Sequence, residues 1–224
     1  MKTYDFAAAL HRTGGLWQAE PLSKFDPSKP HAELTSGRHS DGFVNLSMLL
    51  TDPAELSRAC GHLVRKAIAD FGTSPANPLT ADWVIGSATG GITICHEIGK
   101  WLDVRAAFTE KTDDGKSMQL SRFVIPRGST VLVVEDVMTT GGTCIKTADE
   151  MRRWDCKIIP LILTTTNRRN VVTLSGAGEV FCISSLDLDV VFSDWPADNC
   201  PYCQIGSKPI RPKENNNWSF FMPT

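Results

Sequence analysis

The sequence lacks an excess of charge of either sign. Lys and Arg together number 23 and Asp and Glu 25, which gives a formal net charge of −2 over 224 residues. A strongly basic surface for nucleic acid or an anionic membrane is therefore not expected, and an anionic ligand has to be held by a local arrangement. With 42% hydrophobic and 21% charged residues, the composition excludes collagen-like, coiled-coil and wholly disordered chains.

The sequence also lacks a membrane-spanning run and a secretory signal. Its longest apolar uncharged stretch, residues 83–95, is too short to cross a bilayer. Asp5 lies where a signal peptide would have its apolar centre, so export is not expected. The seven cysteines are odd in number and widely spread, unlike a secreted disulfide framework. These features predict a cytoplasmic protein with mostly reduced thiols.

One close cysteine pair, Cys200 and Cys203, forms a CxxC motif of the kind found in zinc sites and redox pairs. A second CxxC or a CxxxH partner is missing. The five histidines lie far away in the sequence, at positions 11, 31, 39, 62 and 96. The sequence therefore favours a structural or incidental role for the pair over metal binding.

The middle of the chain alternates between helical and strand patterns. Asp52, Pro53 and Glu55 are typical of a helix start, and apolar residues at helical spacing predict a helix from 53 to 71, ended by Gly72. Short apolar runs predict strands at 83–85, 104–108, 119–125, 131–134 and 158–163, with helices after the first and the fourth. This order indicates an α/β protein with a doubly wound, mainly parallel sheet.

The strand at 131–134 leads into the most informative motif. Glu135 and Asp136 follow it directly, and then a loop of threonine and glycine opens a helix. Such a loop holds a phosphate through backbone N–H groups, hydroxyls and the helix dipole. The carboxylates suit sugar hydroxyls or a bridging Mg²⁺ next to it, so the inferred ligand is a sugar 5-phosphate with free hydroxyls. The carboxylate pair alone would more simply be an acidic turn after a core strand.

The whole stretch 131–143 resembles the phosphoribosyl-pyrophosphate signature of type I phosphoribosyltransferases. That resemblance implies a type I phosphoribosyltransferase-like fold: a central parallel sheet flanked by helices, with a small N-terminal hood. It also implies that the glycine-rich turn at 86–91 binds pyrophosphate through its backbone. A Walker A loop and a GxGxxG fingerprint are both absent from the sequence. The usual binding motifs of enzymes for nucleotide hydrolysis and for hydride transfer are therefore missing.

Within this superfamily the chain is most similar to the orotate phosphoribosyltransferase family. Residues 34–45, which include Phe43, resemble that family's hood segment over the base. Arg168 resembles the arginine that pairs with the orotate carboxylate, a task that suits a guanidinium. Residues 108–116 lie where the family has a mobile catalytic loop. The resemblance divides the chain into a hood and lead-in (1–50), a phosphoribosyl-pyrophosphate-binding core (51–197) and a tail (198–224), expected to be extended or mobile beyond Gly206.

The resemblance implies a set of site residues, a metal and a partner. The residues it implies are, for catalysis, Lys111, Lys116 and Asp136; for phosphoribosyl pyrophosphate, Glu135, Asp136, Val137, Met138, Thr139, Thr140, Gly141, Gly142, Thr143, Ser87, Ala88, Thr89 and Lys111; for orotate, Thr139, Arg168 and Phe43. Mg²⁺ is expected on pyrophosphate and water without a direct protein ligand. A homodimer is implied, and neither nucleic acid nor a membrane is expected as a partner.

Two departures from the family pattern leave alternatives open. Thr35 replaces the hood lysine, and the loop has Glu110 where many members have arginine, with no histidine further on. Lys111 keeps its place, and Lys116 supplies a second cation by a shifted alignment. The alternatives are a phosphoribosyltransferase for another base and a non-catalytic protein that senses phosphoribosyl pyrophosphate.

Overall fold

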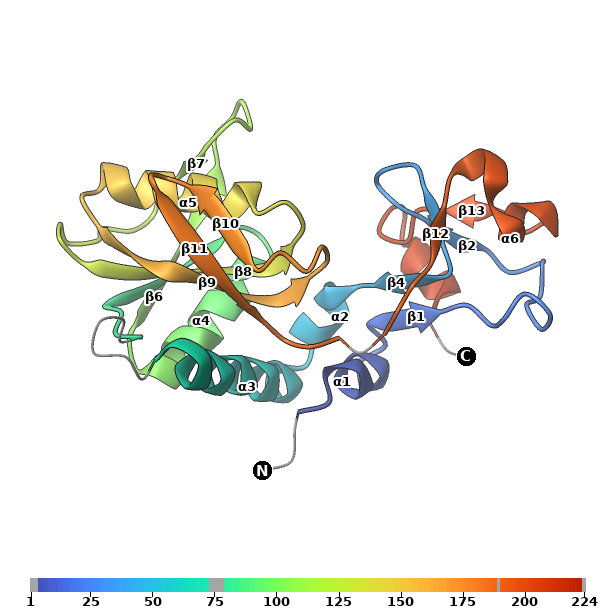
Figure 1. Ribbon diagram of the computed structural model, residues 1–224, viewed down its shortest axis with the longest axis horizontal. Helices are drawn as coiled ribbons and strands as arrows, with labels where there is room; N and C mark the ends of the chain where they lie inside the picture. Colours follow the sequence, from blue (N-terminus) through green and yellow to red (C-terminus); the bar gives the residue numbers. More distant parts are fainter. Residues whose placement is uncertain (1–3, 73–78, 189, 223–224) are drawn as a thin grey trace. The chain divides into compact units, whose positions relative to one another are not determined.

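The computed structural model describes residues 4–72, 79–188 and 190–222. They form two compact units (Figure 1). The core unit contains the described residues of 53–187 together with Tyr4, and the terminal unit contains residues 5–52 and those from 188 onward. Within the described part of the chain, no helix is both long and apolar enough to cross a membrane.

A seven-stranded sheet forms the centre of the core unit, in the order β10-β11-β9-β8-β5-β6-β7. Its five inner strands are mutually parallel, and β10 and β7 are antiparallel at the two edges. The strands are β5 (Trp83–Ser87), β6 (Arg105–Lys111), β7 (Met118–Gln119), β8 (Thr130–Met138), β9 (Lys157–Asn167), β10 (Thr173–Gly176) and β11 (Glu179–Ser185). The predicted α/β class with a mainly parallel sheet is confirmed.

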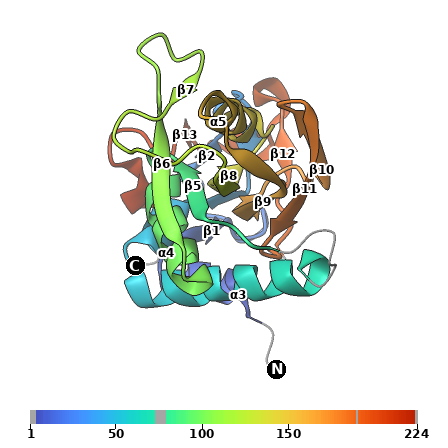
Figure 2. The same cartoon turned by 90° about the vertical axis from the view of Figure 1, so that its left-hand side faces the viewer.

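Three helices cover this sheet, α3 (Pro53–Phe71) and α4 (Gly91–Leu102) on one face and α5 (Gly142–Arg153) on the other (Figures 1 and 2). The predicted bounds of α3 are confirmed, because its apolar residues lie on one side of the helix, where Leu56, Leu63 and Ala67 are buried. On the opposite face of the sheet, Ala148 and Met151 of α5 pack in one apolar cluster with strand residues such as Val133.

Several strands differ in length from their predictions. The run at 131–134 is the buried middle of β8, which continues to Met138 because its polar end still pairs with β9. The β9 strand likewise runs to Asn167 instead of ending at 163. The predicted strand at 119–125 was wrong, since β7 ends at Gln119. Apolar side chains there, such as Ile125, are buried beneath irregular backbone, which the hydrophobic pattern does not distinguish from a strand.

The terminal unit is built from short elements at both ends of the chain. A four-stranded sheet has the order β12-β3-β2-β13, and β1 pairs with β4 in a separate ribbon. The elements are α1 (Phe6–Arg12), β1 (Leu16–Gln18), β2 (His31–Glu33), β3 (His39–Ser40), β4 (Gly42–Val44), α2 (Leu46–Leu50), β12 (Asp194–Trp195), η1 (Ala197–Asn199), α6 (Pro201–Gln204), β13 (Pro209–Ile210) and η2 (Asn217–Phe220).

The expectation that the tail is extended or mobile beyond Gly206 was wrong. Strand β13 pairs with β2, and the rings of Trp218 and Phe221 are buried in a cluster with Ala32 and Phe43. The indole N–H of Trp218 also donates to the carbonyl oxygen of Gly14 at 3.0 Å. The polar composition of residues 206–217 hides the two aromatic rings that anchor the tail.

Candidate functional site

The candidate site lies at the carboxyl ends of four neighbouring parallel strands of the core unit. Strand β8 ends with Glu135–Met138, β5 with Ser87, β9 with Asn167 and β6 with Lys111. Parallel strands bring these ends to the same edge of the sheet, where ligands bind in open α/β folds. The structure therefore brings together the segments that supply all predicted site residues except Phe43.

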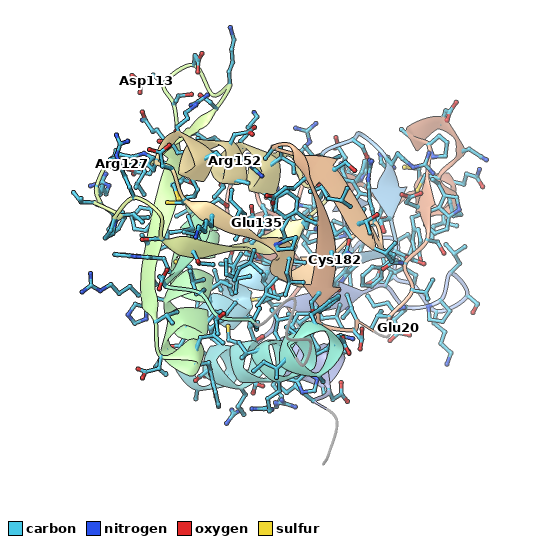
Figure 3. All side chains as sticks on the ribbon, turned by 60° about the vertical axis from the view of Figure 1, so that its left-hand side comes forward. Glu20, Asp113, Arg127, Glu135, Arg152 and Cys182 are labelled. Atoms are coloured by element: carbon cyan, nitrogen blue, oxygen red, sulfur yellow. The ribbon has the colours of Figure 1, made fainter. Side chains whose placement is uncertain are left out.

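Glu135 is buried at the centre of this edge, and its label in Figure 3 marks that position. The Ser87 hydroxyl lies 2.8 Å from one carboxylate oxygen and 2.7 Å from the other, and it donates to this carboxylate. The Asp136 amide donates to the same group at 3.2 Å. Burial, and then the neighbouring Asp136 carboxyl, raise the pKa of Glu135 above its ordinary value, although the Ser87 bond opposes this shift.

Asp136, by contrast, is partly exposed and is held mainly through its backbone. Its carbonyl oxygen accepts hydrogen bonds from the Thr165 hydroxyl at 2.6 Å and from the Thr164 hydroxyl at 3.3 Å. Its carboxylate lies against Gly90, at the N-cap of α4, so closely that a Cβ atom on Gly90 would overlap Oδ2. Sequence analysis missed Thr164 and Thr165, which lie just beyond the strand predicted at 158–163 and have no local signature.

The segment after β5, residues 88–90, leads to Gly90, which lies against the Asp136 carboxylate. Ala88 N–H donates to the Thr109 carbonyl of β6 at 2.8 Å, and the Ala88–Thr89 peptide bond is cis. Ser87 is buried and its hydroxyl is bonded to Glu135, whereas Thr89 is exposed. The three predicted residues of this turn thus lie next to the carboxylate pair, with one hydroxyl turned inward and another available outside.

The loop between β8 and α5 is the segment that the sequence predicts to bind the phosphate. Thr139 and Thr140 are exposed, and Gly141 precedes the helix with φ +75°, a left-handed conformation that favours glycine. No side chain caps the first turn of α5 among the residues described. Its leading N–H groups, with the positive end of the dipole of this 12-residue helix, therefore face the space above the strand ends.

Arg168 follows β9 immediately. Its amide donates to the carbonyl oxygen of Met138 at 3.0 Å, which holds it beside the end of β8. The residue as a whole is exposed at this edge, although neighbouring protein atoms partly surround its guanidinium group. Desolvation lowers the pKa of the Arg168 guanidinium, and the negative charge of Asp136 opposes that shift. The guanidinium thus lies within the field of Asp136 and stays charged at neutral pH.

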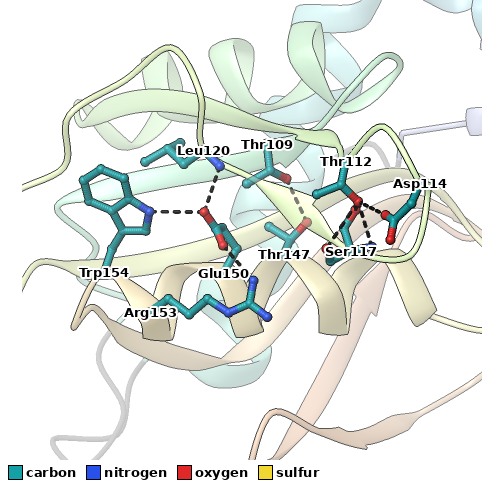
Figure 4. Close-up of polar contacts among 9 residues, drawn as sticks. All are labelled: Thr109, Thr112, Asp114, Ser117, Leu120, Thr147, Glu150, Arg153 and Trp154. Carbon is teal, nitrogen blue, oxygen red and sulfur yellow. Dashed lines mark hydrogen bonds and ion pairs between the residues drawn. The ribbon is translucent and has the colours of Figure 1, made fainter.

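Lys111 and Lys116 lie at the two sides of a projecting β6–β7 hairpin, and Figure 3 places Asp113 at its tip. The hairpin loop is ordered by the Thr112 hydroxyl, which donates to Asp114 at 2.6 Å, and by the Lys116 amide, which donates to the same oxygen at 3.0 Å (Figure 4). Both lysine side chains are exposed. Among the ion pairs of the described residues, none involves either ammonium group.

The base of this hairpin is fixed to α5 (Figure 4). The Glu150 carboxylate accepts from the Leu120 amide at 2.9 Å and from the Trp154 indole at 3.2 Å. The hydroxyls of Thr109 and Thr147 lie 3.0 Å apart across the same interface. The hairpin therefore has an anchored base and an exposed loop, an arrangement suited to a lid.

The departure at Glu110 has a structural partner. Arg122 binds its carboxylate through two nitrogens, at 2.9 and 3.1 Å, and the Ser121 hydroxyl donates to it at 2.5 Å. Glu110 therefore joins the hairpin to the segment after β7. The sequence shows that Glu110 stands where the family often has arginine. It does not show that Arg122 is the partner of this acidic residue.

Phe43 is the predicted site residue that belongs to the other unit. Its ring is buried in the terminal unit, with its centroid 5.9 Å from that of Trp218. Its role in binding orotate stays a prediction.

A cavity of about 790 Å³ lies elsewhere in the core unit, at the amino ends of β5, β6 and β8. It is lined by residues such as Asp82, Asp103 and Arg127. Ligands in this class of fold bind instead at the opposite edge, where the carboxyl ends of the parallel strands lie.

Comparison with known proteins agrees with this geometry. Residues 48–198 match the family described as the phosphoribosyl transferase domain. The chain is 34% identical over 185 residues to an orotate phosphoribosyltransferase of Heliobacterium modesticaldum, which covers 81% of this chain and 88% of that protein. It is 31% identical over 187 residues to the orotate phosphoribosyltransferase of Chlorobaculum parvum, with 84% and 89% covered.

Solved structures share the fold. An orotate phosphoribosyltransferase from Aeropyrum pernix superposes with a TM-score of 0.58 at 24% identity, over 80% of this chain and 91% of that one. The orotate phosphoribosyltransferase of Mycobacterium tuberculosis H37Rv in complex with Fe(III) dicitrate gives a TM-score of 0.55 at 20% identity, over 81% and 95%. The predicted type I phosphoribosyltransferase-like fold is confirmed.

Proposed function

Because the chain belongs to the phosphoribosyltransferase family, we propose that it transfers the phosphoribosyl group of phosphoribosyl pyrophosphate to orotate. The products are orotidine 5'-phosphate and pyrophosphate, a step of pyrimidine synthesis. The observation that carries the proposal is the meeting of three features at one sheet edge: the carboxylates of Glu135 and Asp136, the loop that opens α5, and Arg168. The curated relatives named above support orotate as the acceptor.

In the proposed reaction, the bond between ribose C1 and the pyrophosphate oxygen breaks, and a ring nitrogen of orotate forms the new bond to C1. That nitrogen loses its proton, and pyrophosphate departs as an anion. The ribose passes through a state with oxocarbenium character, whose positive charge the carboxylates of Glu135 and Asp136 stabilise. The N–H groups and hydroxyls of residues 139–143 hold the 5-phosphate in this scheme.

The departing pyrophosphate needs positive charge and protection from water. We assign this task to Lys111 and Lys116 on the β6–β7 hairpin, together with the turn Ser87-Ala88-Thr89. Arg168 pairs with the orotate carboxylate, beside Thr139, and Phe43 belongs to the proposed cover over the base. In this scheme the partly exposed Asp136 carboxylate binds ribose, whereas Glu135 acts from a buried position.

The donor set also fits the Mg²⁺ ion that the family implies. Both Glu135 oxygens lie within hydrogen-bond distance of Ser87, and the partly exposed Asp136 carboxylate can accept hydrogen bonds from the water shell of an ion. When bound, Mg²⁺ neutralises charge on the pyrophosphate; we propose that it is held by phosphate oxygens and water, without a direct protein ligand. We further propose a cytoplasmic homodimer.

The test is pyrophosphate release from phosphoribosyl pyrophosphate and Mg²⁺, with and without orotate. We expect orotate-dependent release that falls by at least about 100-fold in Asp136→Asn and Arg168→Ala. The matched control is Arg169→Ala, an exposed neighbour outside the proposed site. Release with adenine, hypoxanthine or uracil in place of orotate would assign another base. Binding of phosphoribosyl pyrophosphate without release for any base would identify a sensor.

A further inference from the structure

Four metal-ligating side chains converge inside the terminal unit, and none of them belongs to the residues of the proposed phosphoribosyl site. They are His31 of β2, His39 of β3, Cys200 and Cys203, and their ligand atoms all lie within 4.8 Å of one another. Three of the four side chains are buried, and Cys203 is partly exposed. Figure 1 shows α6, which carries the CxxC motif, beside β2 and β13.

The distances agree with one tetrahedral ion. His31 Nε2 lies 3.2 Å from His39 Nδ1, 3.4 Å from Cys200 Sγ and 3.6 Å from Cys203 Sγ, and Cys203 Sγ lies 3.3 Å from His39 Nδ1. A tetrahedral zinc ion with ordinary bond lengths requires N···N separations of about 3.3 Å and S···N separations of about 3.6 Å. Four of the six separations are therefore close to those of a zinc tetrahedron, and the other two are no longer than 4.8 Å.

A neighbouring hydroxyl fixes the His31 tautomer that a metal needs. Ser207 Oγ lies 2.8 Å from His31 Nδ1 and also 2.8 Å from the carbonyl oxygen of Lys29. The carbonyl only accepts, so Ser207 donates to Lys29 and accepts from the Nδ1–H of His31. The lone pair of His31 Nε2 is thereby directed into the cluster. This is the support that metal-binding histidines receive from their surroundings.

Aromatic rings close the cluster from one side. Tyr202, between the two cysteines, stacks on His31 with ring centroids 5.6 Å apart and packs on Phe25 at 4.8 Å. Trp195 lies 5.8 Å from the same tyrosine. Four protein ligands under such a cover leave no open position for a substrate, as in structural rather than catalytic zinc sites.

We propose that His31, His39, Cys200 and Cys203 bind one structural Zn²⁺ ion, which joins the tail to the segment that holds the hood motif. Mixed thiolate and imidazole ligands in a tetrahedron favour zinc over magnesium or calcium. The terminal unit has only short strands and small apolar clusters, so a metal supplies stability that its core does not. Sequence analysis saw the CxxC pair without partners because both histidines precede it by more than 160 positions.

The first experiment measures metal in the full chain purified under reducing conditions without chelator. We expect about one zinc ion per chain by mass spectrometry, and thiolate-to-cobalt charge transfer with tetrahedral d–d bands when Co²⁺ replaces it. In Cys203→Ser and His39→Ala both signals should fall at least about tenfold. The matched controls are Cys182→Ser and His96→Ala, in the core unit.

Two outcomes overturn the proposal. One is less than about one-tenth of a zinc ion per chain with no cobalt spectrum in the folded wild type. The other is a disulfide between Cys200 and Cys203 in protein freshly purified with reductant, detected by thiol titration and mass. Circular dichroism establishes that each variant is folded before its metal content is compared.

A milder variant tests the site without removing a ligand. Ser207→Ala deletes the hydroxyl that orients His31, and loss of such an outer partner typically weakens metal binding by about 10- to 100-fold. Competition with a chromogenic zinc chelator measures this shift in affinity. The control is Ser219→Ala, whose hydroxyl bonds only to the nearby Asn216 carbonyl among the contacts of the described residues. Equal zinc affinity in the Ser207 variant and in wild type would contradict the proposed role of His31.

Discussion

The Ser87 hydroxyl lies within hydrogen-bond distance of both carboxylate oxygens of Glu135, at 2.8 and 2.7 Å, and joins the end of β5 to the end of β8. Removing it should lower kcat/KM about 10- to 100-fold, because the hydroxyl favours the ionised form of Glu135 that the proposed reaction uses, and a hydrogen bond to a charged group contributes about 1.5–3 kcal/mol. Steady-state kinetics of Ser87→Ala measure this effect. Ser175→Ala, an exposed serine of the same unit, is the control, and equal kinetics for the two variants would contradict the assigned role.

The raised pKa of Glu135 predicts a pH-dependent effect on stability. Below the unfolded pKa the carboxyl is protonated in both states and does not change the stability. Between the unfolded and the higher folded pKa, the carboxyl ionises in the unfolded chain but stays protonated in the folded one, so the folded state loses stability as pH rises. Glu135→Gln removes that cost. The difference in melting temperature between the variant and wild type, both without ligand, should therefore increase by several degrees from about pH 5 to about pH 9. A change of about 1 kcal/mol in the free energy of unfolding shifts the melting temperature by about 2–4 °C.

The control for this pH series is Asp113→Asn, which removes an exposed carboxylate from the hairpin tip. Its melting temperature relative to wild type should be nearly flat with pH, because replacing an exposed surface side chain changes stability little. A flat difference for Glu135→Gln as well would mean that the carboxyl is not destabilised by its burial.

The sequence was most informative where one periodic pattern decides the structure. The helix at 53–71 follows from apolar spacing and a proline start, and the motif at 131–143 located a strand that is followed by a short loop and a helix. The pattern did not show how far strands continue, because pairing between β8 and β9 extends the ladder into polar residues such as Thr166. Hydrogen bonding across the sheet, rather than hydrophobicity, sets those ends.

Contacts between distant segments were the least predictable. The bond from Thr165 to the Asp136 carbonyl and the pair between Arg122 and Glu110 involve common residues with no local signature. The same holds for His31, which meets Cys200 only because β2 and β13 pair in one sheet. Such contacts depend on the completed topology, and a single sequence contains no direct signal for them.

Gly141 provides a test of the phosphate loop. Alanine there has to adopt φ +75°, which costs about 1–2 kcal/mol, and its Cβ atom would also overlap the Leu174 side chain. Gly128→Ala has the same backbone cost at φ +79° but meets nothing within 4 Å, so it is a matched control. We expect Gly141→Ala to lose more stability by thermal unfolding and to raise KM for phosphoribosyl pyrophosphate at least about fivefold.

The double variant Gly141→Ala with Leu174→Ala separates the two causes. Removing the leucine side chain relieves the overlap and leaves the backbone cost, so part of the lost affinity for phosphoribosyl pyrophosphate should return. If the double variant binds no better than Gly141→Ala alone, the loop conformation rather than the contact with Leu174 controls the phosphate seat.

The hairpin lysines should affect turnover without affecting folding. Lys111→Ala and Lys116→Ala remove exposed cations, so the free energy of unfolding should change by less than about 0.5 kcal/mol. If these cations stabilise departing pyrophosphate, kcat should fall at least about tenfold. Chemical denaturation and steady-state kinetics measure the two quantities. Lys157→Ala, an exposed lysine at the other end of the sheet, should leave both unchanged; unchanged kcat in both hairpin variants would remove the lid from the mechanism.

Arg168 tests the identity of the base most directly. A guanidinium binds a carboxylate through two parallel hydrogen bonds, whereas lysine offers one compact charge in their place. Arg168→Lys should therefore raise KM for orotate about tenfold or more while KM for phosphoribosyl pyrophosphate changes little, and Arg168→Ala should lose more. Both constants come from one kinetic series in which each substrate is varied in turn. An equal rise of both constants in Arg168→Lys would mean that Arg168 supports the shared site through Asp136, whose charge it faces, rather than recognising the carboxylate of the base.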